Sequence, residues 1–190
     1  MACGDLTANF TIDCTAPLVG GNESTVTLIN FADWQNATVT EDGTYSQELT
    51  DITLLTGITA KKVEGYRNTV RTQYDSSVEN GLTRYKHILN FQIAGDDGVA
   101  KQIVEKLGLG TYVAITFTKS GQVEVFGDGT GLVLQGQNNR DRYANNANAT
   151  IQLASDDDSL EVTVPKNYVG TSSPYSFATA KADIEALWAA

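Results

Sequence analysis

The sequence predicts a mainly β fold, and three observations support this prediction. Residues 112–117 and 123–126 are rich in β-branched and aromatic residues and are joined by a short turn containing Gly121, which is the pattern of a β-hairpin. Two longer β segments are separated by Asn80-Gly81, the strongest short hairpin signal in a sequence. In the interior of the chain only residues 96–107 carry a convincing helical period.

The first part of the chain is expected to form short strands separated by turns. Residues 10–14 alternate between apolar and polar and predict a first strand, and 25–31 is rich in β-formers and predicts a second. The stretch 34–46 is polar and contains a turn signal. Two apolar pieces follow, at 52–55 and 58–63.

The longest predicted hairpin spans residues 66–94, with strands at 66–78 and 82–94. A ribbon of this length that extends from a small body is suited to reaching a neighbouring subunit. Its two strands carry a concentration of cations: Arg67, Arg71, Arg84 and Lys86. We expect either a solvated strand face that protects a sheet edge, or a contact with an acidic neighbour such as a second copy of this chain.

The internal helix at 96–107 is expected to begin at Asp96 or Asp97, whose carboxylate suits a helix N-terminus. Apolar residues recur every three to four positions and are expected to pack on the sheet: Val99, Ile103, Val104 and Leu107. A glycine in the left-handed conformation, Gly108 or Gly110, is expected to end the helix.

After a glycine-rich corner at 127–131, residues 135–148 are polar and are expected to form an exposed loop. Two final strands are expected at 150–154 and 160–164, with Pro165 ending the sheet.

The chain then divides into a β domain at 1–165 and an extension at 166–190. Within the extension, 168–175 is expected to be a linker and 177–188 an alanine-rich helix. Three apolar residues would form the buried face of this helix: Ile184, Leu187 and Trp188.

Charge and composition limit the function classes. The chain has 13 Lys and Arg against 23 Asp and Glu, so its net charge is −10 and it lacks the broad basic surface that tight nucleic-acid binding needs. An acidic wall does suit a channel through which DNA passes without adhering. No apolar run approaches the ~18–20 residues of a membrane span, and the N-terminus has no secretion-signal pattern. Cys3 and Cys14 are either reduced thiols or a bridge tying the N-terminal arm to the first strand.

No catalytic set is evident, and we expect a protein that is not an enzyme and has no cofactor or metal. The single histidine, His87, is expected to fill a half-buried position in a strand. Asp128 is expected to bond its own turn, and 156–158 to be a solvated loop tip rather than a cation site. An alternative function is a carbohydrate-binding or adhesin β-sandwich using loop aromatics: Trp34, Tyr143, Tyr168 and Tyr175.

Four short motifs carry a resemblance to a known group of proteins: residues 1–3 with Cys14, 77–81 with Tyr85, 125–132, and 139–143. In these motifs the chain, over about residues 1–165, resembles small virion proteins from the tail-gene region of phages that infect Bacteroidetes. The resemblance implies a β-sandwich or half-barrel of tail-tube type with one flanking helix and a long hairpin. The extra sequence between 34 and 61 and the C-terminal helix depart from the shorter members and leave room for a connector-ring role.

The resemblance therefore implies a ring-forming subunit of a phage tail tube or head–tail connector, made in the host cytoplasm and located in the virion. Its expected partners are identical copies in a hexameric or dodecameric ring and neighbouring tail or portal-associated proteins, with DNA as transiting, non-specific cargo and no membrane. Candidate interface residues lie in the long hairpin and the polar loop: Arg67, Arg71, Tyr74, Asn80, Gly81, Arg84, Lys86, Arg140, Arg142 and Tyr143.

Overall fold

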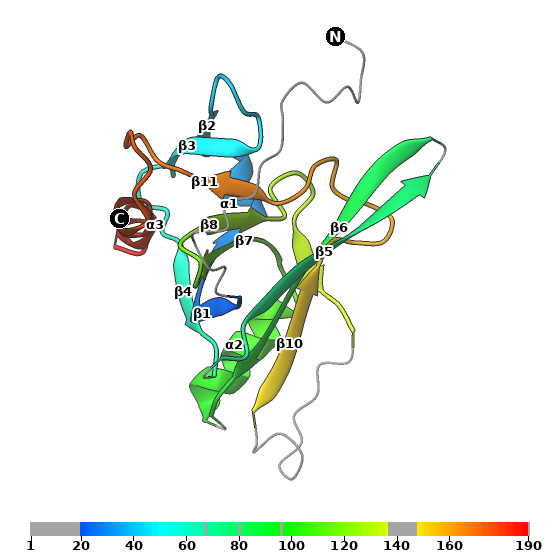
Figure 1. Cartoon of the computed structure of the whole chain (residues 1–190). Helices are drawn as coiled ribbons and strands as arrows, with labels where there is room; N and C mark the ends of the chain where they lie inside the picture. The colour runs from blue at the N-terminus through cyan, green and yellow to red at the C-terminus, as the bar shows by residue number, and fades with distance from the viewer. Residues whose placement is uncertain (1–19, 67, 80, 96, 137–147, 190) are drawn as a thin grey trace.

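Many strands follow one another closely along the chain, and a single curved sheet joins them (Figure 1). The computed structural model describes residues 20–189 except 67, 80, 96 and 137–147. The elements of the first half are β1 (Asn22–Asn30), α1 (Phe31–Gln35), β2 (Thr38–Glu41), β3 (Glu48–Thr53), β4 (Lys61–Glu64), β5 (Arg71–Glu79) and β6 (Leu82–Ile93). Those of the second half are α2 (Gly98–Leu107), β7 (Thr111–Thr118), β8 (Val123–Phe126), β9 (Leu132–Leu134), β10 (Ala149–Ala154), β11 (Lys166–Tyr168) and α3 (Phe177–Ala186).

All described strands belong to one sheet with the order β2-β3-β11-β8-β7-β9-β10-β6-β5, and β1 pairs with both β7 and β4. The pairings are antiparallel except that of β11 with β3. Strands make up 44% of the described residues and helices 16%, so the mainly β prediction is confirmed, together with the long hairpin, the flanking helix α2 and the C-terminal helix α3.

Strand β7 lies between two hydrophobic cores, and this explains why its sequence alternates poorly. Ala114 belongs to the core shared with β6, β10 and α2, whereas Ile115 and Phe117 belong to the core covered by β3, β11 and α3. Every residue from 113 to 117 is buried. A strand that is covered on both faces needs apolar side chains at consecutive positions, so its sequence loses the period of two.

Helix α2 begins as expected and ends differently. The Asp97 carboxylate accepts a hydrogen bond from the Ala100 N–H at 2.8 Å, which confirms the cap. Ala100 and Leu107 are buried, but Val99 is 66% exposed, so its predicted place in the buried stripe is wrong. Neither of the glycines expected to end the helix has a positive φ: Gly108 is right-handed at −74°, and Gly110 leaves room for the Tyr112 ring instead.

The prediction that the sheet ends at Pro165 is wrong. β11 follows directly and hydrogen-bonds to β3 and β8, because a proline removes only its own N–H donor and the next residues can pair normally. The expected strand at 160–164 is reduced to one bridge between Glu161 and Tyr85. The short helix α1, which begins at the last residue of the strand predicted at 25–31 and ends in the stretch marked as polar, was not predicted.

The C-terminal helix packs on the second core, as its sequence predicts. Ile184 is buried, and Leu187 and Trp188 are partly buried against the same core. The Trp188 indole N–H donates to the buried hydroxyl of Thr27 in β1 at 2.9 Å. This contact joins the last part of the chain to one of its first strands.

In the part of the chain that the structure describes, no helix is long and apolar enough to cross a bilayer.

Candidate assembly arm and a buried histidine–carboxylate cluster

The hairpin β5–β6 extends beyond the rest of the sheet, and we call its outer half, residues 74–79 and 82–86, the arm (Figure 1). The inner half of β6 pairs with β10, from Ile88 to Ile93. Further out, β6 pairs only with β5 among the described strands, apart from the single bridge between Tyr85 and Glu161. The two strands of the arm therefore pair mainly with each other, and one bridge joins the arm to the rest of the described chain.

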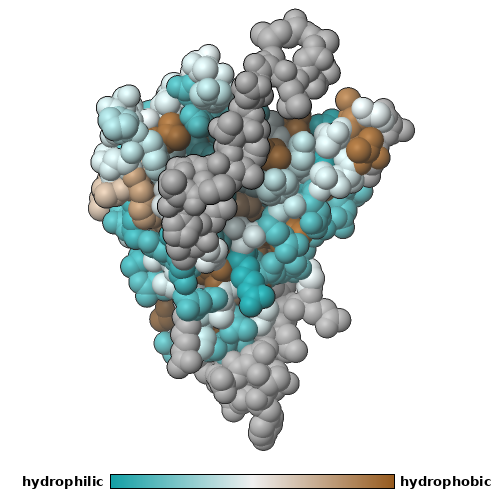
Figure 2. Space-filling view, viewed as in Figure 1, coloured by the Kyte–Doolittle hydropathy of each residue, from teal (hydrophilic) through white to brown (hydrophobic). Residues whose placement is uncertain are grey.

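The arm exposes large apolar side chains. Tyr74 is 52% exposed, Val78 72% and Leu82 59%, and apolar atoms gather at its outer end (Figure 2). Tyr74 lies opposite His87 and Val78 opposite Thr83, so both belong to the hairpin face that joins the core further in, at Leu89. The core-facing side of the hairpin thus continues outward as an apolar surface that no described residue buries.

The predicted cations of the hairpin share one face but do not form one patch. Arg84 is opposite Ser77 and Lys86 opposite Asp75, whereas Arg71 is six positions from Ser77 along β5, or roughly 20 Å. Lys86 pairs with Asp157 at 2.5 Å. Arg71 and Arg84 form no ion pair with a described residue.

The other predicted interface residues divide into two groups. Gly81 has a φ of 79°, as its place in the hairpin turn requires. The rest lie outside the described residues: Arg67, Asn80, Arg140, Arg142 and Tyr143. The two cysteines, the first predicted strand at 10–14 and most of the polar loop at 135–148 also lie outside them.

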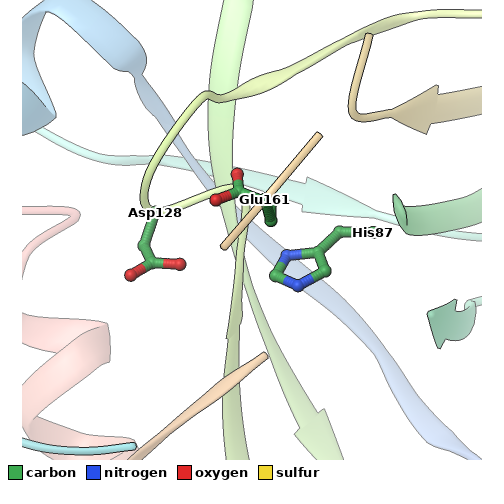
Figure 3. Close-up of side chains that lie close together, drawn as sticks. All are labelled: His87, Asp128 and Glu161. Carbon is green, nitrogen blue, oxygen red and sulfur yellow. The ribbon is translucent and has the colours of Figure 1, made fainter. Parts of the chain in front are cut away.

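A second feature, which the sequence did not predict, is a buried cluster of His87, Asp128 and Glu161 (Figure 3). His87 comes from β6, Asp128 from the glycine-rich corner after β8, and Glu161 from the segment before β11. One potential metal-ligand atom from each residue lies within 4.8 Å of the others. The sequence predicts a half-buried His87, but in the structure this side chain is completely buried.

Both ring nitrogens of His87 are engaged. The Gly127 N–H donates to Nδ1 at 3.0 Å, and Nε2 lies 3.0 Å from the Thr163 carbonyl oxygen. Since a carbonyl only accepts, Nε2 carries the proton and the ring is neutral. Burial lowers the pKa of His87, in opposition to the Thr163 hydrogen bond and the charge of Asp128.

Glu161 holds the glycine-rich corner in place. Its carboxylate accepts hydrogen bonds from the N–H groups of Gly129 and Thr130 and from the Thr130 hydroxyl, at 3.1, 3.0 and 3.0 Å. Burial raises the pKa of Glu161, and the charge of Asp128 adds to this, while the three hydrogen bonds act in the opposite direction.

Asp128 does not bond its own turn, so that expectation is wrong. Its Oδ2 pairs with Lys166 at 2.9 Å, and Lys166 also pairs with Glu41 at 2.7 Å. The other oxygen, Oδ1, is buried and has no hydrogen-bond partner among the described residues. Glu161 binds the turn instead, because the glycines let the backbone N–H groups of Gly129 and Thr130 point toward its carboxylate.

The cluster joins the hairpin to the glycine-rich corner and to β11. Neither nitrogen of His87 is free to act as a base, and a metal ion on Nδ1 would have to displace the Gly127 N–H. The geometry therefore supports a structural joint between three segments that are far apart in the sequence.

Glu161 and Lys166 were missed by sequence reasoning. One signal was available for Glu161, which stands between Leu160 and Val162 in an apolar context. An isolated carboxylate in such a context indicates a buried acceptor that needs donors.

The three described aromatics among those proposed for sugar binding do not form a platform. Trp34 is 6% exposed and its indole N–H donates to the Asp128 carbonyl, and Tyr168 is 4% exposed. Tyr175 is partly buried and its hydroxyl donates to the Gly121 carbonyl at 3.0 Å. The Asp156–Asp158 run is an exposed turn closed by the Asp158 N–H to Asp156, as expected of a loop tip.

Compared with protein-family models, curated proteins and solved structures, the chain gives no significant match.

Proposed function

We propose that this chain is a phage virion structural protein, a ring-forming subunit of the tail tube or head–tail connector that builds a conduit for DNA. The observation that carries the proposal is the arm, with its exposed Tyr74, Val78 and Leu82. A two-stranded hairpin is marginally stable in water, and exposed apolar side chains on it favour contact with another surface.

The position of the arm favours identical copies as partners. β5 is the last of the described strands in the sheet, and no described strand pairs with its outer edge, so this edge suits pairing with an added strand. An arm that contacts a different surface of the next copy makes a head-to-tail contact, and rotation closes such contacts into rings. Hexamers or dodecamers are the ring sizes we propose.

The charge of the chain agrees with a conduit. A net charge of −10 leaves no basic surface to hold DNA, so DNA would pass through the ring without specific binding. We place the protein in the virion, next to other tail or portal-associated proteins, and assign it no enzymatic role.

The test is the oligomeric state of the purified full chain, measured by light scattering and by negative-stain imaging over a range of concentrations. We expect rings with an open channel. The double variant V78S/L82S should lose them, because each serine replaces an exposed apolar contact on the arm.

The matched control is V99S/L109S. Val99, in the first turn of α2, and Leu109, two residues after its end, are 66% and 84% exposed and lie away from the arm. This variant should assemble as the unaltered protein does. A chain that stays monomeric at every concentration, or rings that survive V78S/L82S, would contradict the proposal.

A further inference from the structure

A groove runs between β5 and β8. It consists of two adjoining hollows of about 530 and 460 Å³, and Thr72, Gln73 and Glu124 line both. One wall is β5, the last of the described strands in the sheet, and the far end, which reaches the base of the arm at Tyr74, is also lined by Phe126 and Pro165. The groove therefore combines a strand edge that no described strand pairs with and apolar side chains, as sites for strand addition do.

Glu124 is a partly buried carboxylate at the place where the two hollows meet. It forms no ion pair with any described residue, although Arg71 lines the same hollow. Burial raises the pKa of Glu124, because the charged carboxylate loses water there. A buried carboxylate of this kind favours a cation from outside.

The arm carries such a cation. Of its two basic residues, Lys86 already pairs with Asp157, whereas Arg84 has no acidic partner among the described residues. Arginine suits a carboxylate at an interface, because its planar guanidinium donates two parallel hydrogen bonds. Arg84 belongs to the outer part of β6, where, beyond the bridge between Tyr85 and Glu161, no described strand pairs with the outer edge.

We propose that the arm of one copy lies in the β5–β8 groove of the next copy, with Arg84 of the first copy paired to Glu124 of the second. This inference rests on the proposed function and names the contact that closes the ring. The exposed Leu82, which lies on the same hairpin face as Arg84, would meet the apolar end of the groove, and the edge of β5 would pair with the outermost part of β6, beyond Tyr85.

The experiment uses charge reversal in the full chain, read by light scattering and negative-stain imaging. Glu124→Arg alone and Arg84→Glu alone should each raise the concentration needed for half-maximal assembly about tenfold or more, because each places like charges together. The double variant E124R/R84E should assemble again. Glu64→Arg, on an exposed residue of β4, is the control for the change in net charge and should leave assembly unchanged.

Mixing the two single variants in equal amounts is the decisive step. In a ring that alternates them, the arm of the R84E chain meets the groove of the E124R chain, and the unaltered arm meets the unaltered groove. Every contact is then complementary in any ring with an even number of copies. We therefore expect the mixture to assemble although neither variant does so alone, and circular dichroism to show that both are folded.

Three results would overturn the inference. Normal assembly of Glu124→Arg would show that the groove is not the docking site. Failure of both the double variant and the mixture to assemble would show that Arg84 and Glu124 do not pair with each other. Rescue in the double variant but not in the mixture would place the pair within one copy. In all three cases the proposed function would still be supported if the unaltered chain forms rings and V78S/L82S does not.

Discussion

The two hairpins of this molecule have similar sequence patterns and opposite surroundings. β7–β8 turns at Gly121, with a φ of 86°, and β5–β6 turns at Gly81, with a φ of 79°. In β7 five consecutive residues are buried, whereas Val78 and Leu82 are among the most exposed apolar residues described. The local pattern therefore determined that each segment is a hairpin but not which one lies inside.

The difference comes from the partners that the rest of the chain supplies. β7–β8 is paired with β9, which follows it closely along the chain, and with β1 and β11, and it is covered by α3, the last three being distant in sequence. The outer half of β5–β6 receives a single bridge from Glu161. A hairpin without such cover has apolar side chains available for another molecule, which is the basis of the proposed assembly.

The largest effect should come from removing a buried side chain from the inner hairpin. Phe117 is completely buried in the second core, so Phe117→Ala should lower the free energy of unfolding by about 3–5 kcal/mol. Leu82→Ala on the arm should change it by no more than about 0.5 kcal/mol in the isolated subunit. Urea denaturation at low protein concentration measures both, and equal losses would show that the arm is packed within the subunit.

Two glycines with nearly the same φ provide a second test. A Cβ on Gly81 would meet open space, whereas a Cβ on Gly127 would lie 2.7 Å from Leu132 Cγ. Alanine at either position is strained by about 1–2 kcal/mol because φ is positive. Crowding adds about 1–3 kcal/mol for Gly127→Ala. Thermal unfolding of both variants checks this, and similar melting temperatures would mean that the corner after β8 is as open as the arm's turn.

A smaller, pH-dependent effect should come from His87, which lies where the two hairpins meet. Its pKa is lowered in the folded protein, so the unfolded chain binds this proton more readily, at an ordinary pKa of about 6.5. The contribution of His87 to stability is then complete above about pH 6.5 and decreases as the pH falls below it.

The variant His87→Gln isolates this contribution. At pH 7.5 it should be less stable by about 1–3 kcal/mol, because a buried hydrogen-bond partner is lost, and the difference should shrink toward pH 5.5. The raised pKa of Glu161 acts in the opposite direction, favouring the folded state as the pH falls, and is shared by both proteins. Parallel stability profiles in urea denaturation at the two pH values would show that His87 does not titrate differently on unfolding.

Local chemistry predicted those elements that depend on neighbouring residues. Asp97 caps α2 because its carboxylate reaches an N–H three residues ahead, and Gly81 turns a hairpin because glycine tolerates a positive φ. The buried face of α3 at Ile184 followed from helical spacing. The exposure of Val99 could not be predicted, since the spacing does not show how far the sheet extends beneath the helix.

The candidate sites depended much more on tertiary structure. The sequence identified the basic hairpin, but it could not show that Lys86 is already paired while Arg84 is not. It treated His87 and Asp128 separately, although they lie 41 positions apart in the chain and share one buried cluster. Glu161 completes that cluster through donors from the corner at 127–131.

By itself the sequence determined a mainly β chain with two glycine-turned hairpins, a capped helix, a C-terminal helix and an acidic surface, because each of these follows from residues close together along the chain. Only the tertiary structure decided that β7 is covered on both faces, that β11 continues the sheet after Pro165, and that the β5–β6 arm is left uncovered. The physical reason is that burial depends on segments brought together from distant parts of the chain.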